Sequence, residues 1–315
     1  MAAQRTGARA AVRIGTRGSR LALAQAEQVR AGLVAAHDDL TADDVELVVI
    51  RTTGDRVTDR PLAEVGGKGL FAKEVEEALL AGDVDIAVHS MKDLETVLPD
   101  GVSVPCMLPR EDPRDVFISA IADSIAALPE GAVVGTASQR RRAQLKHARK
   151  DLEIVMFRGN VDTRLAKVER GDVDATLLAL AGLNRLGLAK RVTAVLEPEE
   201  MLPAAGQGAV GVECRSGDTR GHDLVTSLGD PDTHTCITCE RSVLAALGGT
   251  CHTPIAAHAR LVEDRLQLTA RVLRTDGSEM LETRRDGVPA DAEALGHDAG
   301  AELRSRAGPD FFAGR

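Results

Sequence analysis

The sequence contains no tryptophan and no tyrosine, and only five of its 315 residues are phenylalanine. Proteins that bind single-stranded nucleic acid stack its bases on aromatic side chains, so this scarcity disfavours that class. A surplus of positive charge is also missing, because 39 Lys and Arg stand against 48 Asp and Glu, giving a formal net charge of −9. Net negative charge repels polyanions. We therefore expect no nucleic-acid partner.

Long apolar runs and a cysteine framework are absent as well. No stretch approaches the ~20 apolar residues that span a bilayer, and residues 1–11 lack the apolar segment of a secretory signal. Their Ala- and Arg-rich composition resembles a transit peptide, but structure is expected from Val12 onward, which favours a frayed tail. Five scattered cysteines leave at least one thiol free, which favours a reducing compartment. We expect a cytoplasmic protein with no membrane segment.

What the chain does contain is an alternation of strands and helices. The composition is that of a globular protein, and the length suggests two or three domains. The expected elements of the first part are strands at 12–16, 45–51 and 85–89, a helix at 20–37 with Ser19 as its N-cap, and a helix at 70–80. This alternation predicts a mainly parallel sheet with crossover helices.

Two short motifs occur twice in the same order. Gly-Asp-Val-Asp precedes an expected strand at 82–85 and again at 171–174, and Ile-Gly-Thr at 14–16 matches Val-Gly-Thr at 134–136. The repetition predicts two α/β units of similar plan. Hinges between them are expected at Glu111–Asp115 (EDPRD), where Asp-Pro favours an extended or turn conformation, and at 202–211.

The expected fold class is α/β, with two doubly wound domains and a small α+β third domain. Helices at 240–247 and 291–306 and strands at 260–262 and 266–273 form the third domain. The predicted boundaries are residues 1–111 with 208–229 for domain 1, 112–207 for domain 2 and 230–315 for domain 3.

Arginines follow several of the expected strands. Arg17 follows the first strand, and Arg140 and Arg141 follow Gly135-Thr136. Arg158 follows an apolar strand, Arg164 lies one turn into the next expected helix, and Arg185 follows the strand-like segment 177–183. The carboxyl ends of strands line the ligand crevice of open α/β sheets, where helix N-termini also attract anions. Guanidinium groups bind carboxylates and phosphates through two hydrogen bonds. The pattern predicts a pocket for a small molecule with several acidic groups.

Other motifs leave alternatives open. Lys92-Asp93 ends another strand and could bind a charged substrate or stabilise a developing cation, although such a pair is usually solvated surface. Gly66-Gly67-Lys68-Gly69 lacks the ending of a Walker motif, which excludes nucleotide hydrolysis. Cys236 and Cys239 are more simply two ordinary thiols than a zinc or redox site, and no metal is expected. Cys251 follows a glycine turn, from which its thiol can project.

Nine motifs in order along the chain resemble the porphobilinogen deaminase family. They are GTRGS (15–19), VGGKGLF (65–71), DIAVHSMKD (85–93), EDPRD (111–115), VGTASQRR (134–141), RGNVDTRL (158–165), AGLNRLGL (181–188), LPAAGQGAVGVECR (202–215) and GGTCHTP (248–254). The resemblance implies two domains like the lobes of periplasmic binding proteins and a third domain carrying a dipyrromethane cofactor on a thioether to Cys251. It implies a monomeric transferase that joins four porphobilinogen molecules head to tail, releases ammonia and yields hydroxymethylbilane.

The same resemblance assigns roles to individual residues. Asp93 matches the aspartate that stabilises positive charge on the pyrrole, and Lys92 and Arg17 are the other expected catalytic residues. The expected cofactor contacts are Cys251, Lys68, Lys92, Asp93, Thr136, Ser138, Arg140, Arg141, Arg158 and Arg185. The expected substrate contacts are Arg17, Ser19, Arg158, Arg164 and Gln207. Porphobilinogen carries an acetate and a propionate, so a growing chain accumulates carboxylates that these arginines can bind.

Three positions depart from the family pattern, and two other functions compete with this one. Glu64 stands where a lysine is common, Glu95 replaces a proline after Lys-Asp, and Thr250 replaces the glycine before the cysteine. A β-branched residue tolerates a positive φ poorly, so the turn at Thr250 is expected to differ. The rival functions are a two-lobed anion-binding protein without catalysis and a zinc or thiol-redox protein built on Cys236 and Cys239.

Overall fold

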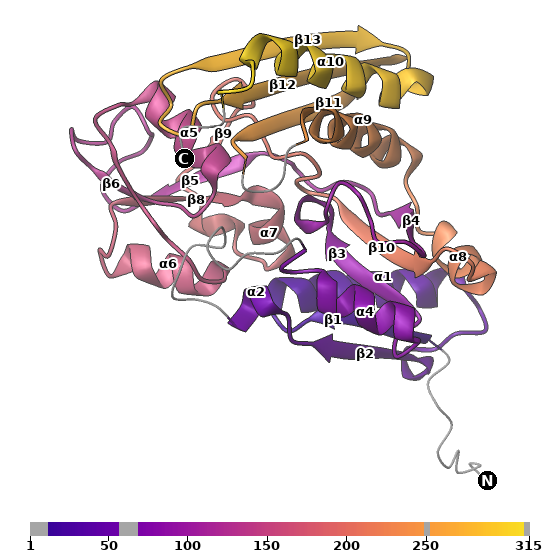
Figure 1. The fold of residues 1–315 in the computed structure, drawn as a ribbon. Coiled ribbons are helices and arrows are strands. Elements are labelled where there is room, and N and C mark those ends of the chain that lie inside the picture. Colours follow the sequence, from indigo (N-terminus) through magenta and orange to yellow (C-terminus); the bar gives the residue numbers. More distant parts are fainter. Residues whose placement is uncertain (1–11, 57–68, 249–252, 312–315) are drawn as a thin grey trace.

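The computed structural model describes residues 12–56, 69–248 and 253–311, which form three sheets with their helices (Figure 1). The first sheet contains β1 (Val12–Arg17), β2 (Val45–Ile50), β3 (Ile86–Ser90), β4 (Val102–Met107) and β10 (Val210–Arg215). Its helices are α1 (Arg20–Ala36), α2 (Thr53–Arg56), α4 (Lys73–Ala81) and α8 (Thr219–Thr226), with 3₁₀ turns η1 (Ala42–Asp44) and η2 (Met91–Asp93).

The second sheet lies beside the first, and the third unit lies across both (Figure 1). Its strands are β5 (Asp115–Ser119), β6 (Val133–Gly135), β7 (Glu153–Val155), β8 (Ala175–Ala179) and β9 (Ala194–Leu196). Its helices are α5 (Gln139–Ala148), α6 (Val161–Glu169) and α7 (Leu180–Arg185), with the 3₁₀ turn η3 (Ala189–Arg191).

The two large sheets have the same plan, as the repeated motifs predict. Their strand orders, β2-β1-β3-β10-β4 and β7-β6-β8-β5-β9, correspond strand by strand and in direction. The last Asp of each Gly-Asp-Val-Asp motif makes the same contact: Asp85 Oδ2 accepts from the Arg13 amide at 2.8 Å and Asp174 Oδ2 from the Val133 amide at 2.7 Å. The repeat therefore reflects one local structure used twice.

The expectation of mainly parallel sheets is wrong in part. β1 is parallel to β2 and β3, but β10 is antiparallel to both β3 and β4. β10 belongs to a segment that returns to the first sheet after the second has been completed, and it enters between β3 and β4 antiparallel to both, as β5 does between β8 and β9. Both sheets are thus mixed, and the α/β class is confirmed.

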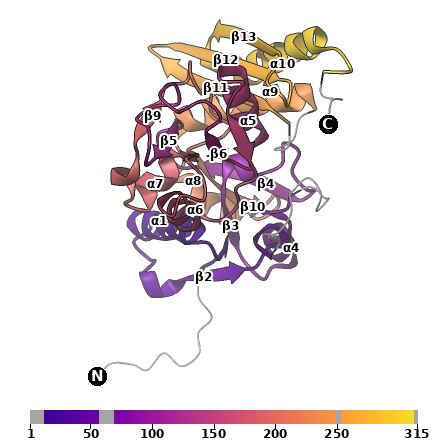
Figure 2. The ribbon, with the colours of Figure 1, turned by 90° about the vertical axis from the view of Figure 1, so that its left-hand side faces the viewer.

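Burial of small and branched apolar residues holds the helices of the first unit against its sheet. Ala22, Ala26, Val29 and Leu33 recur at helical spacing on α1 and are buried, and Ser19 caps the helix by accepting from the Ala22 amide at 3.2 Å. α1 packs on the face of the sheet that carries Ile86 and Val88, and α4 packs on the face that carries Ala87. Figure 2 shows the two helices on either side of β3.

The third unit has β11 (Ile255–Val262), β12 (Arg265–Leu273) and β13 (Met280–Gly287) in one antiparallel sheet, with α9 (Pro231–Leu247), α10 (Ala292–Ala307) and the 3₁₀ turn η4 (Pro289–Asp291). The sequence did not indicate β13. The expected helix start at 240 is also wrong, because Asp230 accepts from the Thr233 amide at 2.7 Å and Pro231 opens the first turn. The poor helix formers between Thr233 and Thr238 concealed this start.

Among the described helices, none combines the length and apolar character needed to cross a membrane.

Candidate active site

Arg17 marks the first half of the site, at the carboxyl end of β1. Its Nη2 lies 2.5 Å from Asp55 Oδ1, and its Nη1 lies 3.7 Å from Asp93 Oδ2. Its guanidinium also stacks over Phe71, 4.2 Å from the ring centroid. Burial raises the pKa of Asp55, but the hydrogen bond and charge of Arg17, together with hydrogen bonds from Thr52, outweigh it and the pKa falls below its usual range. Arg17 therefore joins two carboxylates at the mouth of a pocket.

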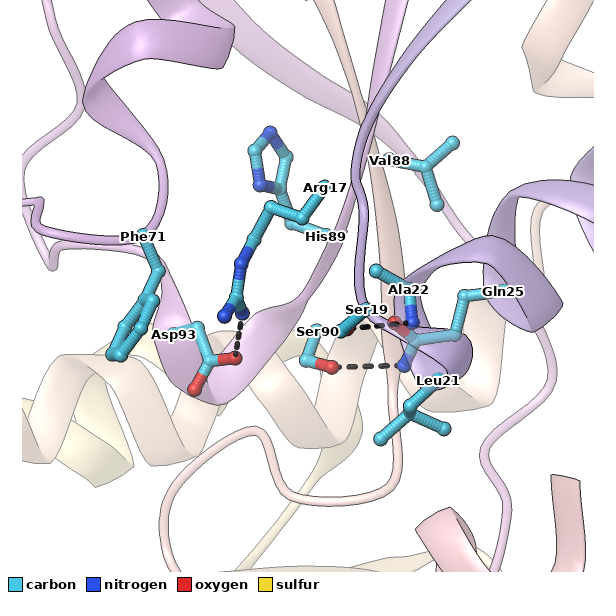
Figure 3. Close-up of a pocket in the computed structure, with 10 residues that line it drawn as sticks. All are labelled: Arg17, Ser19, Leu21, Ala22, Gln25, Phe71, Val88, His89, Ser90 and Asp93. Carbon is cyan, nitrogen blue, oxygen red and sulfur yellow. Dashed lines mark hydrogen bonds and ion pairs between the residues drawn. The ribbon is translucent and has the colours of Figure 1, made fainter. Parts of the chain in front are cut away.

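This pocket is lined by α1, β3 and the turn after β3 (Figure 3). Gln25 Nε2 donates to Ser90 Oγ at 2.8 Å, which fixes the end of β3 against α1. Ser19 lines the pocket while its hydroxyl caps α1. Asp93 extends from η2 toward Arg17, and at 3.7 Å the pair is too far apart for a hydrogen bond. The Asp93 carboxylate thus keeps lone pairs for N–H donors of a ligand.

Asp115 forms a buried centre that holds two of the expected arginines. Arg140 Nη1 lies 2.6 Å from Asp115 Oδ2 and Arg141 Nη2 lies 2.6 Å from Oδ1. Gln207 Nε2 donates to the same carboxylate at 3.1 Å and to the Pro113 carbonyl at 2.7 Å. The side chain of Asp115 is fully buried, and despite that burial the two guanidinium groups hold its pKa well below the usual range.

Ser138 and Thr136 position these arginines. Ser138 Oγ accepts from the Arg141 amide at the start of α5, and Thr136 Oγ1 accepts from the Ser138 amide at 3.2 Å. Arg140 and Arg141 then leave the first turn of α5 toward Asp115. Their charges are partly neutralised by the protein itself, which the sequence pattern did not reveal.

Lys92 joins the Asp115 centre to the Arg17 pocket. Its Nζ donates to Gln207 Oε1 at 3.4 Å. Burial lowers the pKa of Lys92 to about 8, with Arg141 and Arg140 opposing its charge and Asp93 and Asp115 supporting it. The lysine is therefore poised to gain from an anionic partner.

Arg164, one turn into α6, forms no ion pair with a carboxylate of the described residues. Its Nε has no hydrogen-bond partner among the described residues, and burial followed by repulsion from Arg141 and Arg158 lowers its pKa to about 10. Asp93 and Asp115 share this region with four cations, Lys92, Arg140, Arg141 and Arg164. A buried guanidinium is costly unless something anionic pairs with it, so the region fits a polyanion.

Arg185 lies apart from this cluster, at the hinge. Its Nη2 donates to the Gly208 carbonyl at 2.9 Å, and burial lowers its pKa. It lines a hollow of about 500 Å³ with residues of α1 and the 109–111 segment. The structure thus places Arg185 between the two large units rather than beside Arg164.

Two expected site residues, Lys68 and Cys251, fall outside the described residues, as do Glu64 and Thr250. Conversely, Asp55 and Asp115 were missed as site residues. Asp115 was visible within EDPRD, but that motif indicated only a hinge. The available signal was that Asp115 begins an apolar strand, β5, in the same unit as the helix that carries the two arginines. Asp55 follows a strand by five residues, and no spacing distinguishes it from surface aspartates.

Cys236 and Cys239 are buried on α9, and burial raises the pKa of the two thiols to about 11 and about 12. Thiols with such pKa values are poor nucleophiles and poor metal ligands at neutral pH. Within 12–56, 69–248 and 253–311, no cluster of three or more His, Cys, Asp or Glu side chains is arranged to hold a metal ion. This geometry favours the interpretation as ordinary core thiols.

Comparison with known proteins shows the family of the chain. Residues 12–223 match the family model "Porphobilinogen deaminase, dipyromethane cofactor binding domain", and residues 234–305 match "Porphobilinogen deaminase, C-terminal domain". The chain is 56% identical to a porphobilinogen deaminase of Paracoccus denitrificans, over 96% of both chains, and 55% identical to that of Nitrobacter winogradskyi, over 95% and 94%. It is 53% identical to a chloroplastic porphobilinogen deaminase of Oryza sativa, over 96% of this chain and 85% of the relative. The chain therefore belongs to the porphobilinogen deaminase family.

Proposed function

We propose that this protein polymerises four porphobilinogen molecules head to tail into hydroxymethylbilane, releasing one ammonia at each addition, on a dipyrromethane primer attached to Cys251. The observation that carries the proposal is the surplus of cations around Arg164, whose Nε has no hydrogen-bond partner among the described residues, in a chain from this family. Acidic side chains of the pyrroles would neutralise that surplus.

The residues present fit a dipyrromethane group. Lys92 and Arg158, with the unpartnered Nε of Arg164, would hold its acetate and propionate groups. Arg140 and Arg141 are both tied to Asp115, and their remaining contacts go to the Leu202 and Leu177 carbonyls, so they would act mainly by fixing Asp115 and adding positive charge. When bound, the group would supply the free pyrrole carbon from which the chain grows.

Asp93 would stabilise the positive charge that develops on porphobilinogen as ammonia leaves. Its carboxylate would accept the pyrrole N–H while Arg17, 3.7 Å away, keeps it oriented. Arg17 is itself held by Asp55 and Phe71, so the carboxylate faces a preorganised partner. Ser19 would contribute a further contact to the substrate, whereas the buried Gln207 would act by positioning Asp115 and Lys92.

We further propose the domain division 1–111 with 208–229, 112–207 and 230–315, and a cytoplasmic monomer that binds no nucleic acid. The membership of β10 in the first sheet supports the discontinuous first domain. The net charge of −9 supports the lack of a nucleic-acid partner, and the free thiols at Cys106, Cys214, Cys236 and Cys239 support a reducing compartment.

The test compares wild type with Asp93→Ala and the control Asp162→Ala, whose exposed carboxylate pairs with Arg20. Wild type and control should convert porphobilinogen to hydroxymethylbilane, and intact mass should show a two-pyrrole adduct in all three proteins. Asp93→Ala should lose nearly all turnover, because the developing cation loses its counter-charge. Near-normal turnover would remove Asp93 from the mechanism, and a wild type without adduct and without product would refute the function. A non-catalytic anion-binding protein would bind porphobilinogen unchanged.

A further inference from the structure

Helix α9 of the third unit contacts the turn that carries Asp93. Ile237, Glu240 and Arg241 are spaced three and four residues apart, so they share one face of the helix. Ile237 is fully buried in a cluster with Met91 and Leu94, the residues on either side of Lys92-Asp93. This apolar contact places the helix directly beneath η2.

Arg241 adds a polar contact to the same turn. Its Nη2 donates to the Glu95 carbonyl at 2.6 Å and to the Thr96 carbonyl at 3.1 Å, and its Nη1 reaches the Leu94 carbonyl at 3.5 Å. Three consecutive carbonyls after Asp93 therefore converge on one planar guanidinium. Such charge-assisted bonds are stronger than neutral ones and fix direction as well as distance.

Two nearby carboxylates, those of Glu213 and Glu95, compensate the charge of Arg241. Burial lowers the pKa of Arg241, while the carboxylates of Glu213 and Glu95 favour its charged form. Glu213, on β10, is fully buried, and its Oε2 lies 3.0 Å from His89 Nε2. Glu95 Oε1 in turn accepts from the Gly69 amide at 2.8 Å, which links the turn to the segment that carries Phe71.

We propose that Arg241 is a positioning residue for the reaction: from the helix that leads to Cys251, it holds the backbone after Asp93 and thereby sets where the Asp93 carboxylate stands. The inference rests on the proposed function. It makes the third unit more than a carrier of the attachment cysteine, because the same helix determines the geometry of the catalytic carboxylate. Glu95, which stands where the family commonly has proline, links the same turn to Gly69 through its side chain.

The test separates the effect of the Arg241 hydrogen bonds to the three carbonyls from the effect of its buried charge. Arg241→Met combined with Glu213→Gln removes both charges together, so no buried carboxylate is left unpaired by the loss of the arginine. Glu213→Gln alone keeps the arginine and its bonds to the turn, and it is the matched control. Arg241→Lys keeps the charge but cannot contact three carbonyls with a planar group.

We expect the double variant to retain the two-pyrrole mass and to lose kcat by about 10²-fold, the cost of a displacement of about 1 Å at a reacting group. Its KM should stay within about twofold of wild type, and amide hydrogen exchange in residues 94–98 should accelerate. Glu213→Gln should keep wild-type kcat and exchange, and Arg241→Lys should fall between the two.

Unchanged exchange and kcat in the double variant would overturn the inference. An equal loss of kcat in Glu213→Gln would also overturn it, because the charge pair rather than the carbonyl bonds would then be responsible. A wild type that makes no hydroxymethylbilane would refute the proposed function, whereas the exchange comparison would still decide whether Arg241 holds the turn.

Discussion

Glu76, on α4, lies in a buried acidic cluster behind β3, and its removal should stabilise the protein at neutral and higher pH. Only 6% of the residue is exposed. Burial, and to a smaller extent the charges of Glu213, Glu95 and Glu77, raise its pKa from 4.5 to about 7 against the opposing effect of His89. Its Oε1 has no hydrogen-bond partner among the described residues. The ionised form is therefore disfavoured in the folded state.

The direction and size of the effect of Glu76 on the free energy of unfolding follow from proton binding. Between pH 4.5 and about 7 the folded protein holds a proton on Glu76 that the unfolded chain has released, so stability falls as pH rises through this window. A shift of about 2.5 units at ~1.4 kcal/mol each sets an upper limit of ~3.5 kcal/mol. Structural relaxation around Glu76, which interacts with other titrating residues, reduces this upper limit. We therefore expect the substitution to change the free energy of unfolding by about 1–3 kcal/mol.

The assay is urea unfolding of wild type and Glu76→Gln between about pH 5 and pH 8. The two proteins should have similar stability near the lower limit, and the variant should be more stable by about 1–3 kcal/mol at pH 8. Glu77→Gln is the control, because that carboxylate lies on the same helix and its side chain is 62% exposed. A stability difference that does not grow with pH, or an equal effect in the control, would refute the reasoning.

Two further predictions concern the cation cluster. Asp115→Asn should destabilise the protein by about 3–5 kcal/mol in denaturant unfolding, because Arg140 and Arg141 lose the carboxylate that compensates them in a buried site; a loss below ~1 kcal/mol would show that water already solvates the pair. The kcat/KM for porphobilinogen should fall as pH rises through about 8, where Lys92 loses its proton. Lys92→Arg should lack this decline, and an unchanged pH profile in that variant would assign the decline to another group.

Local patterns accounted for the elements that frame the site. The Ser19 cap, the buried stripe of α1 and the paired Gly-Asp-Val-Asp motifs each depend on residues close in the chain, and the structure confirms all three. The predictions that were wrong share a cause, which is contact between residues far apart in the sequence. β10 pairs with strands more than 100 residues away, so no local pattern shows its direction. α9 extends to Pro231 through residues whose helix propensity is poor but whose buried face packs on the third sheet.

The sequence by itself determined that arginines follow strand ends in a repeated α/β plan, and the order of its motifs indicated the family. Only the tertiary structure decided how those arginines differ: Arg140 and Arg141 are paired with Asp115, Arg17 with Asp55, and Arg164 with no carboxylate in the described part of the chain. The physical reason is that charge compensation depends on distance in space. Asp115 meets Gln207 across 92 residues of sequence, and no periodicity within a helix or strand encodes such a meeting.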